Sequence, residues 1–131
     1  NLIKNIINEI NSNIVIYHTK PIDELILKSN LVLVISPDGF DPSTVILESI
    51  ILGKPVVNFV LDEKFYDFSY QQHNAVLSIT ENDDIQKITL KILDDLTFKN
   101  KLISNGKIFL DDYLVNPQNA SKILAKKLLE L

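Results

Sequence analysis

Three side chains near the middle of the chain have the spacing of a small binding site. Ser43 and Thr44 are adjacent hydroxyl residues, and Glu48 follows Thr44 by four positions. On a helix, residues three or four apart share a face, so Asp41, Thr44 and Glu48 would form one polar stripe. Hydroxyls beside the unpaired N–H groups of a helix N-terminus can hold phosphate, and a carboxylate one turn further on can accept both ribose hydroxyls. The spacing therefore predicts a site for a nucleoside diphosphate.

The two histidines are further candidates for phosphate contact or proton transfer. His18 directly follows the apolar run Ile14 to Tyr17, so it would lie at the ligand edge of a sheet if that run is a strand. A structural histidine in a strand-end turn is the alternative. His73 has less support from its position. The two histidines are far apart, and no carboxylate spacing completes a metal motif, so no metal site is expected.

An aromatic loop and three acid pairs are the remaining polar or aromatic features. The loop contains Phe65, Tyr66, Phe68 and Tyr70. It could stack on a base or form a lid, but we favour packing over the sheet edge or against a lobe outside this sequence. The acid pairs are adjacent in sequence, which on a helix turns the two side chains apart. We interpret Asp83/Asp84, Asp94/Asp95 and Asp111/Asp112 as helix caps and solvated faces.

Short apolar runs alternating with helical patterns must position these residues. Strand-like runs cover residues 14–17, 31–35, 55–60 and 75–79, and helical spacing covers residues 2–10, a stretch from Pro21, and 42–52. From Asp83 onward the pattern is helical, and Gly106 and Pro117 would divide it into separate helices at 99–105, 107–114 and 118–131. Strands that are apolar throughout and alternate with helices predict an α/β fold. We expect a Rossmann-like, doubly wound parallel sheet of about four or more strands, covered on both faces and followed by C-terminal helices.

Composition excludes several classes of protein. The 131 residues allow one domain, and no linker or repeat marks a second. The net charge of -4, from 17 acidic and 13 basic residues, gives no basic field for binding nucleic acid. All the basic residues are lysines, so phosphate would be held by lysine, hydroxyls or backbone amides. The absence of cysteine excludes disulfides, and no apolar run approaches the roughly 20 residues of a membrane span.

The stretch STVILESIILGKPVV resembles the donor-binding core of glycosyltransferases with the two-lobed GT-B fold. The family pattern is a small hydroxyl residue, an acid followed by Ala or Ser, and then Gly, any residue, Pro and Val. It is matched here by Ser43, Glu48, Ser49, Gly53, Pro55, Val56 and Val57. A weaker similarity covers residues 13–115. The resemblance implies that this motif binds the diphosphate and ribose of a nucleotide sugar, with roles for Ser43, Thr44 and Glu48.

The loop before this motif resembles the Ser-x-x-Glu-Gly-Phe-Gly loop of retaining members of the family. The resemblance places Asp38 at the sugar-contacting acid and Gly39 at the glycine, which also suits a tight turn. The acids Asp38 and Glu48 are ten positions apart, whereas the family has eight, so retention or inversion of the sugar stays open. UDP-sugar 2-epimerases share the architecture, but their Asp-Ser-Gly-Gly run is absent here.

We therefore expect residues 1–131 to be one domain, the C-terminal nucleotide-sugar-binding lobe of a longer glycosyltransferase for glycan or surface polysaccharide synthesis. A nucleotide diphosphate sugar would be the donor, and no cofactor is expected. The catalytic base would lie on an N-terminal lobe, so the fragment alone would be inactive. We expect a cytoplasmic location, or one at the inner face of a membrane through other parts of the protein. The alternatives are a non-catalytic Rossmann-like ligand-binding or regulatory module and a UDP-sugar 2-epimerase fragment.

Overall fold

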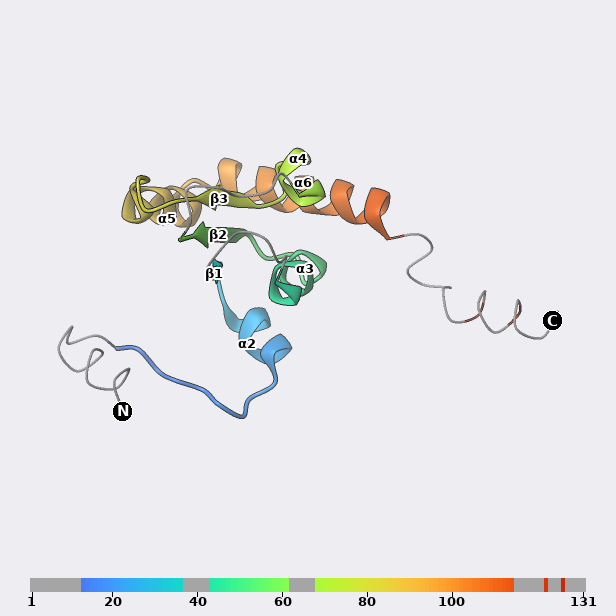
Figure 1. Cartoon of the computed structure of the whole chain (residues 1–131), viewed down its shortest axis with the longest axis horizontal. Helices are drawn as coiled ribbons and strands as arrows, with labels where there is room; N and C mark the ends of the chain where they lie inside the picture. The colour runs from blue at the N-terminus through green and yellow to red at the C-terminus, as the bar shows by residue number, and fades with distance from the viewer. Residues whose placement is uncertain (1–12, 37–42, 62–67, 115–121, 123–125, 127–131) are drawn as a thin grey trace.

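A three-stranded parallel sheet forms the centre of the computed structural model, which describes residues 13–36, 43–61, 68–114, 122 and 126. The strands lie in the order β1 (Val32–Ser36), β2 (Val56–Val60) and β3 (Leu77–Ile79). The described helices are α2 (Ile22–Lys28), α3 (Thr44–Ile51), α4 (Ser69–Gln72), α5 (Ile85–Asp94) and α6 (Leu96–Tyr113). Figure 1 shows α5 and α6 beside β3, and α2 and α3 toward β1. In the part of the chain that is described, no helix is long and apolar enough to cross a membrane.

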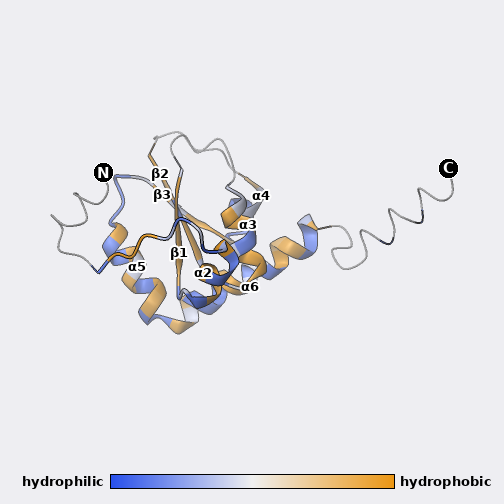
Figure 2. Cartoon of the chain, turned by 90° about the horizontal axis from the view of Figure 1, so that it is seen from below, coloured by the Kyte–Doolittle hydropathy of each residue, from blue (hydrophilic) through white to orange (hydrophobic). Residues whose placement is uncertain are grey.

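Helices cover both faces of the sheet, and Figure 2 shows α5 on one side of the strands with α3 and α6 on the other. Successive side chains of a strand point to opposite faces, so β2 contributes to two core clusters. Val56 packs with Ile50 of α3 and Phe109 of α6, whereas Val57 packs with Ile92 of α5. The 18 residues of α6 span about 27 Å, enough for this helix to contribute to both clusters. The predicted α/β class and parallel sheet are confirmed, with three strands in the described residues instead of four or more.

The run Ile14 to Tyr17 is not the strand that its apolar composition predicts. These residues have no regular structure, and Val15 is 66% exposed. Figure 1 shows the segment apart from the sheet. β1 is therefore an edge strand in the described structure, and its Leu33 and Ile35 are exposed. The prediction was wrong because an apolar run becomes a buried strand only where both of its faces are covered, and here neither this run nor one face of β1 is.

Helix α3 begins and ends where its local sequence dictates. Ser43 is the N-cap, and its Oγ accepts a hydrogen bond from the N–H of Val45 at 3.3 Å. The helix thus begins at Thr44, two residues later than the predicted start at Pro42. At the other end Gly53 has a φ of 67°, a left-handed conformation that glycine adopts without strain. Gly53 therefore ends the helix.

The lysine that follows Gly53 connects α3 to α2. Lys54 Nζ donates to the carbonyl oxygens of Leu27 at 2.7 Å and Ser29 at 2.9 Å, at the C-terminal end of α2. The last carbonyls of a helix lack partners within the helix, and a cation is favourable beside them. Lys54 therefore holds the end of α2 next to the turn between α3 and β2.

The acid pairs at the ends of α5 act as helix caps. Asp84 accepts from the N–H of Lys87, and Asp95 accepts from the N–H of Phe98, both at 2.9 Å. The interpretation of these two pairs as caps is confirmed. Because Asp95 starts a new helix, Leu96 belongs to α6 and not to α5, and it is 67% exposed.

Residues 99–113 lie in the single helix α6 and not in two helices separated at Gly106. Gly106 is buried inside this helix, and a Cβ atom at that position would lie 3.0 Å from Cγ2 of Ile50. The glycine therefore allows the close approach of α6 to α3 without crowding Ile50, and it does not mark a helix end. The predicted helix over residues 2–10 lies outside the described residues, as does most of the one over 118–131.

Substitutions at Gly106 should report on this contact. Gly106→Ala gains helix propensity worth about 1 kcal/mol but crowds Ile50, so we expect little net change in the free energy of unfolding. Ile50→Leu removes the β-branch methyl that the new Cβ would meet, so Gly106→Ala should be more favourable in that background. Denaturant unfolding of the two single variants and the double variant measures the coupling.

The control is Ser104→Ala, which changes propensity at an exposed position of the same helix. An equal effect of Gly106→Ala with Ile50 and with Leu at position 50 would show that the two helices do not meet as described.

Candidate functional site

A cavity of about 300 Å³ lies between α3, α4 and α6. Helix α3 contributes hydroxyl and aliphatic side chains, and the other two helices contribute mainly aromatic rings. The lining residues are Ser43, Thr44, Ile46, Leu47, Ile50, Phe68, Ser69, Tyr70, Phe109 and Tyr113. We call this the aromatic cavity. Its volume is at the lower end of the range for small-molecule sites, roughly 300–1,000 Å³.

The N-terminus of α3 lies beyond the carboxyl end of β1, because β1 ends at Ser36 and the helix begins at Thr44. Ligands of open parallel sheets bind at this edge. The Oγ atom of Ser43 already accepts the Val45 N–H, so its own O–H is left to donate. Thr44 is exposed and lines the aromatic cavity together with Ser43. The structure thus brings the two predicted hydroxyls to one hollow at the predicted edge.

Glu48 lies one turn after Thr44 on α3 and is not among the described residues that line the aromatic cavity. The cavity is lined by Leu47 and Ile50 and not by Glu48. The glutamate side chain is partly buried, and its Oε2 atom is buried without a hydrogen-bond partner among the described residues. A buried carboxylate oxygen without a donor is unfavourable. Oε2 of Glu48 is therefore an unused hydrogen-bond acceptor, and Glu48 is not among the described lining residues of the aromatic cavity.

The remaining predicted site residues do not join this arrangement in the described structure. Asp38 and Gly39 lie outside the described residues, and so does Asp41. His18 is exposed and follows no strand, so the expectation that a strand end carries it to the ligand edge was wrong. The described part of the chain holds no group of three or more acidic or histidine side chains placed to bind a metal ion.

A row of four aromatic rings forms one wall of the aromatic cavity. Tyr70 stacks on Phe68 with ring centroids 5.4 Å apart and meets Phe109 edge-on at 6.3 Å. Phe109 in turn stacks on Tyr113 at 5.0 Å. Phe68 and Tyr70 pack in the core cluster with residues of α3, β2 and α6, which confirms packing but not the expected position at the sheet edge or against another lobe. Phe65 and Tyr66 lie outside the described residues. Sequence analysis missed Phe109 and Tyr113, whose spacing of four residues on a helix was the available signal.

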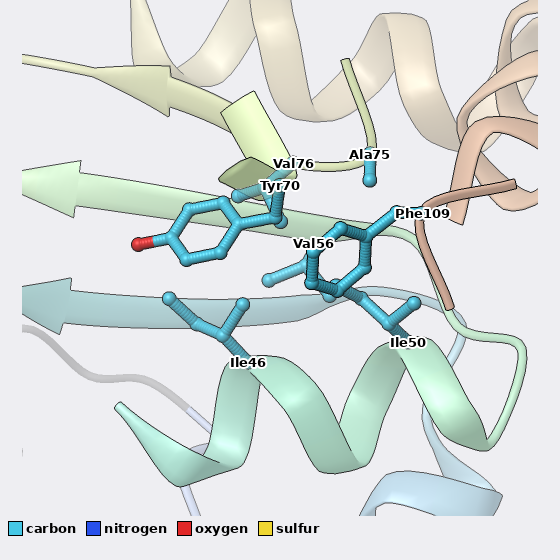
Figure 3. Packing of buried hydrophobic residues seen from close by; sticks show 7 residues of the cluster. All are labelled: Ile46, Ile50, Val56, Tyr70, Ala75, Val76 and Phe109. Atoms are coloured by element: carbon cyan, nitrogen blue, oxygen red, sulfur yellow. The ribbon is translucent and has the colours of Figure 1, made fainter. Parts of the chain in front are cut away.

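The hydroxyl of Tyr70 is the unusual polar group of this wall. The residue is 6% exposed, and its Oη atom has no hydrogen-bond partner among the described residues. Figure 3 shows the ring above Ile46, with the oxygen directed toward the carboxyl ends of the strands. Burial raises the pKa of Tyr70 to about 12, so the hydroxyl is neutral near pH 7.

Hydrogen bonds on both sides of α4 hold Tyr70 in place. Gln71 accepts from the N–H of Phe68 at 2.7 Å and donates to Ser78 Oγ on β3 at 2.6 Å. After the helix, His73 contacts the carbonyl of Ser69 through Nδ1 at 2.7 Å and Asp112 of α6 through Nε2 at 2.9 Å.

Both ring nitrogens of His73 therefore face acceptors, which only the doubly protonated imidazolium can satisfy together. The Ser69 carbonyl and then the Asp112 carboxylate raise the pKa of His73 above its ordinary value. The ring links α4 to α6 beside the aromatic cavity, and it satisfies both acceptors when it is protonated.

This link should make stability depend on pH. The folded state holds the His73 proton more tightly than the unfolded state does, so the stabilisation is complete below the ordinary pKa of 6.5 and is lost as pH rises through the raised pKa. We expect the melting temperature to fall with increasing pH above 6.5, and His73→Gln to remove this component. Thermal unfolding between pH 5.5 and 8.5 measures it.

Asp112→Asn should reduce the slope without abolishing it, because the Ser69 carbonyl remains. Asp111→Asn removes the same charge from the adjacent position and serves as the control. A His73→Gln protein with the same pH profile as the unaltered chain would contradict the assignment.

No protein-family model, no curated protein and no solved structure matches this chain. The resemblance of residues 43–57 to a glycosyltransferase motif is therefore carried by those residues alone. A function for this chain has to be argued from α3, its N-terminal hydroxyls, Glu48 and the aromatic cavity.

Proposed function

We propose that this chain is the donor-binding lobe of a glycosyltransferase and that it binds the nucleoside diphosphate part of a nucleotide sugar at the N-terminus of α3. In this proposal Ser43 and Thr44 contact the diphosphate, and Glu48 accepts hydrogen bonds from the ribose hydroxyls. The sugar transfer itself requires groups that we do not assign to this chain. The donor base and the acceptor are left open.

The observation that carries the proposal is the unpartnered carboxylate oxygen of Glu48. Oε2 is buried, and in the described structure nothing donates a hydrogen bond to it. Two vicinal hydroxyls, as in ribose, supply two donors to the two oxygens of one carboxylate. Hydrogen bonds to a charged group are worth more than those between neutral groups, about 1.5–3 kcal/mol each. A ribose would therefore satisfy Glu48 at the place where the sequence motif expects it.

The N-terminal turn of α3 supports a diphosphate next to that ribose. The chain has no arginine, so phosphate must be held by helix amides, hydroxyls or lysine. The bond from Val45 N–H to Ser43 Oγ is long at 3.3 Å, and a phosphate oxygen could replace Ser43 as the acceptor. Thr44 is exposed one turn before Glu48, which gives the order of phosphate and ribose along the helix.

The core behind α3 makes these groups rigid. Ile46 is 1% exposed and Ser49 is fully buried, and the hydroxyl of Ser49 donates to the carbonyl of Val45 at 2.6 Å. With this face anchored in the core, Thr44 and Glu48 keep a fixed separation of one helical turn. Preorganised contacts of this kind lower the cost of ordering a ligand site.

Nucleotide titrations test the proposal. We expect at least one of UDP, GDP and CDP to bind, and Glu48→Gln to weaken that binding about tenfold by removing the charged acceptor while keeping the shape of the side chain. The 2′-deoxy form of the same nucleotide should bind the unaltered chain more weakly than the ribose form. Glu48→Gln should reduce this difference. Calorimetry on the four combinations of protein and nucleotide gives the coupling.

Glu24→Gln is the matched control, because this glutamate is exposed on α2 away from the proposed site. Failure of all three nucleotides to bind would favour a non-catalytic module over a donor-binding lobe. Equal discrimination against the deoxyribose form by the unaltered chain and by Glu48→Gln would remove Glu48 from the ribose.

A further inference from the structure

The aromatic cavity has a hydrogen-bonding group that its own surroundings do not use. Tyr70 is only 6% exposed, and its Oη atom has no hydrogen-bond partner among the described residues. The same ring lines the cavity. A buried hydroxyl without a partner costs free energy, and most buried tyrosines in folded proteins have one. The unused group therefore marks a place where a bound molecule would supply the missing hydrogen bond.

The rest of the lining limits the chemistry of that molecule. The described lining residues include no charged side chain, and their polar atoms belong to hydroxyls and the backbone. Four aromatic rings and three aliphatic side chains supply the larger part of the wall, which suits flat apolar surfaces. A phosphate or carboxylate would gain no counter-charge inside this lining and would lose its water.

We propose that the aromatic cavity is a separate binding site for a neutral ligand that carries an apolar ring and a hydroxyl group, and that Tyr70 Oη is the hydrogen-bond partner of that hydroxyl. A volume of about 300 Å³ accommodates one or two rings. The site adjoins the N-terminus of α3 through Ser43 and Thr44, but it does not depend on nucleotide binding there.

The position of Tyr70 makes its hydroxyl selective for the bound molecule. The ring is held between Phe68 and Phe109, and α4 is attached to β3 through Gln71 and to α6 through His73. The oxygen is therefore held in place, and because it is buried, a ligand hydroxyl reaches it only when the side chains beside it move slightly. A ring without a hydroxyl would leave the Tyr70 oxygen unpaired.

The test uses 4-methylphenol and toluene, two probes that differ by one hydroxyl. Binding is followed by NMR through the methyl signals of Ile46, Leu47 and Ile50, which line the cavity. We expect both probes to shift these signals in the unaltered chain. The preference for 4-methylphenol over toluene, measured as the ratio of their dissociation constants, should be about fivefold larger in the unaltered chain than in Tyr70→Phe. Tyr113→Phe, which removes a hydroxyl from a half-exposed ring of the same wall, should keep the preference.

A second readout is the stability of the empty protein. Because Oη has no partner to lose, Tyr70→Phe should unfold at the same temperature as the unaltered chain or at a higher one. A lower melting temperature would mean that the hydroxyl is already hydrogen-bonded, and it would overturn the proposal. So would the absence of methyl shifts with either probe, or the same preference for 4-methylphenol with Tyr and with Phe at position 70.

Discussion

The contact between Ile50 of α3 and Gly106 of α6 is the constraint on which the rest of the structure depends. The absence of a side chain at Gly106 lets α6 approach α3 closely enough for Phe109, three residues later, to enter the same core cluster. Phe109 then supports Tyr70, as Figure 3 shows, and so brings α4 over the first turn of α3. The aromatic cavity exists because three helices meet around one close contact. A Cβ atom at position 106 would lie 3.0 Å from Cγ2 of Ile50, so a larger residue there requires the Ile50 side chain to shift.

This arrangement gives one helix two different polar environments. On one face of α3, Ser43 and Thr44 border a cavity whose described lining consists of aliphatic side chains, rings and hydroxyls and includes no charged side chain. On the neighbouring face, the Oε2 atom of Glu48 is buried and has no hydrogen-bond partner among the described residues. An anionic group is favoured only at the helix N-terminus, where the backbone amides carry partial positive charge, and a neutral ring is favoured only in the cavity. The two proposed sites therefore differ in chemistry although Ser43 and Thr44 border both of them.

Sequence alone predicted the elements whose signals are local. The continuous apolar runs around Val34 and Val57 form β1 and β2, and Ser43 and Gly53 carry the cap and the left-handed turn that delimit α3. Sequence alone did not predict the features that depend on a residue far away in the chain. Gly106 breaks isolated helices, but here its role is set by Ile50, 56 positions earlier in the sequence. The apolar run before His18 predicts a strand, but no neighbouring strand pairs with it in the described structure.

The functional residues follow the same division. Ser43, Thr44 and Glu48 could be found from spacing because a helix fixes their relation, whereas Tyr70 could not, since its importance arises from rings on α6 that pack around it.

The central claim is that α3 holds a nucleotide along its first two turns. A crystal structure with the best-binding nucleoside diphosphate tests it most directly. The account predicts phosphate oxygens within hydrogen-bonding distance of Ser43 or Thr44 and ribose hydroxyls on Glu48; a nucleotide bound elsewhere, with Glu48 turned into solvent, would contradict it.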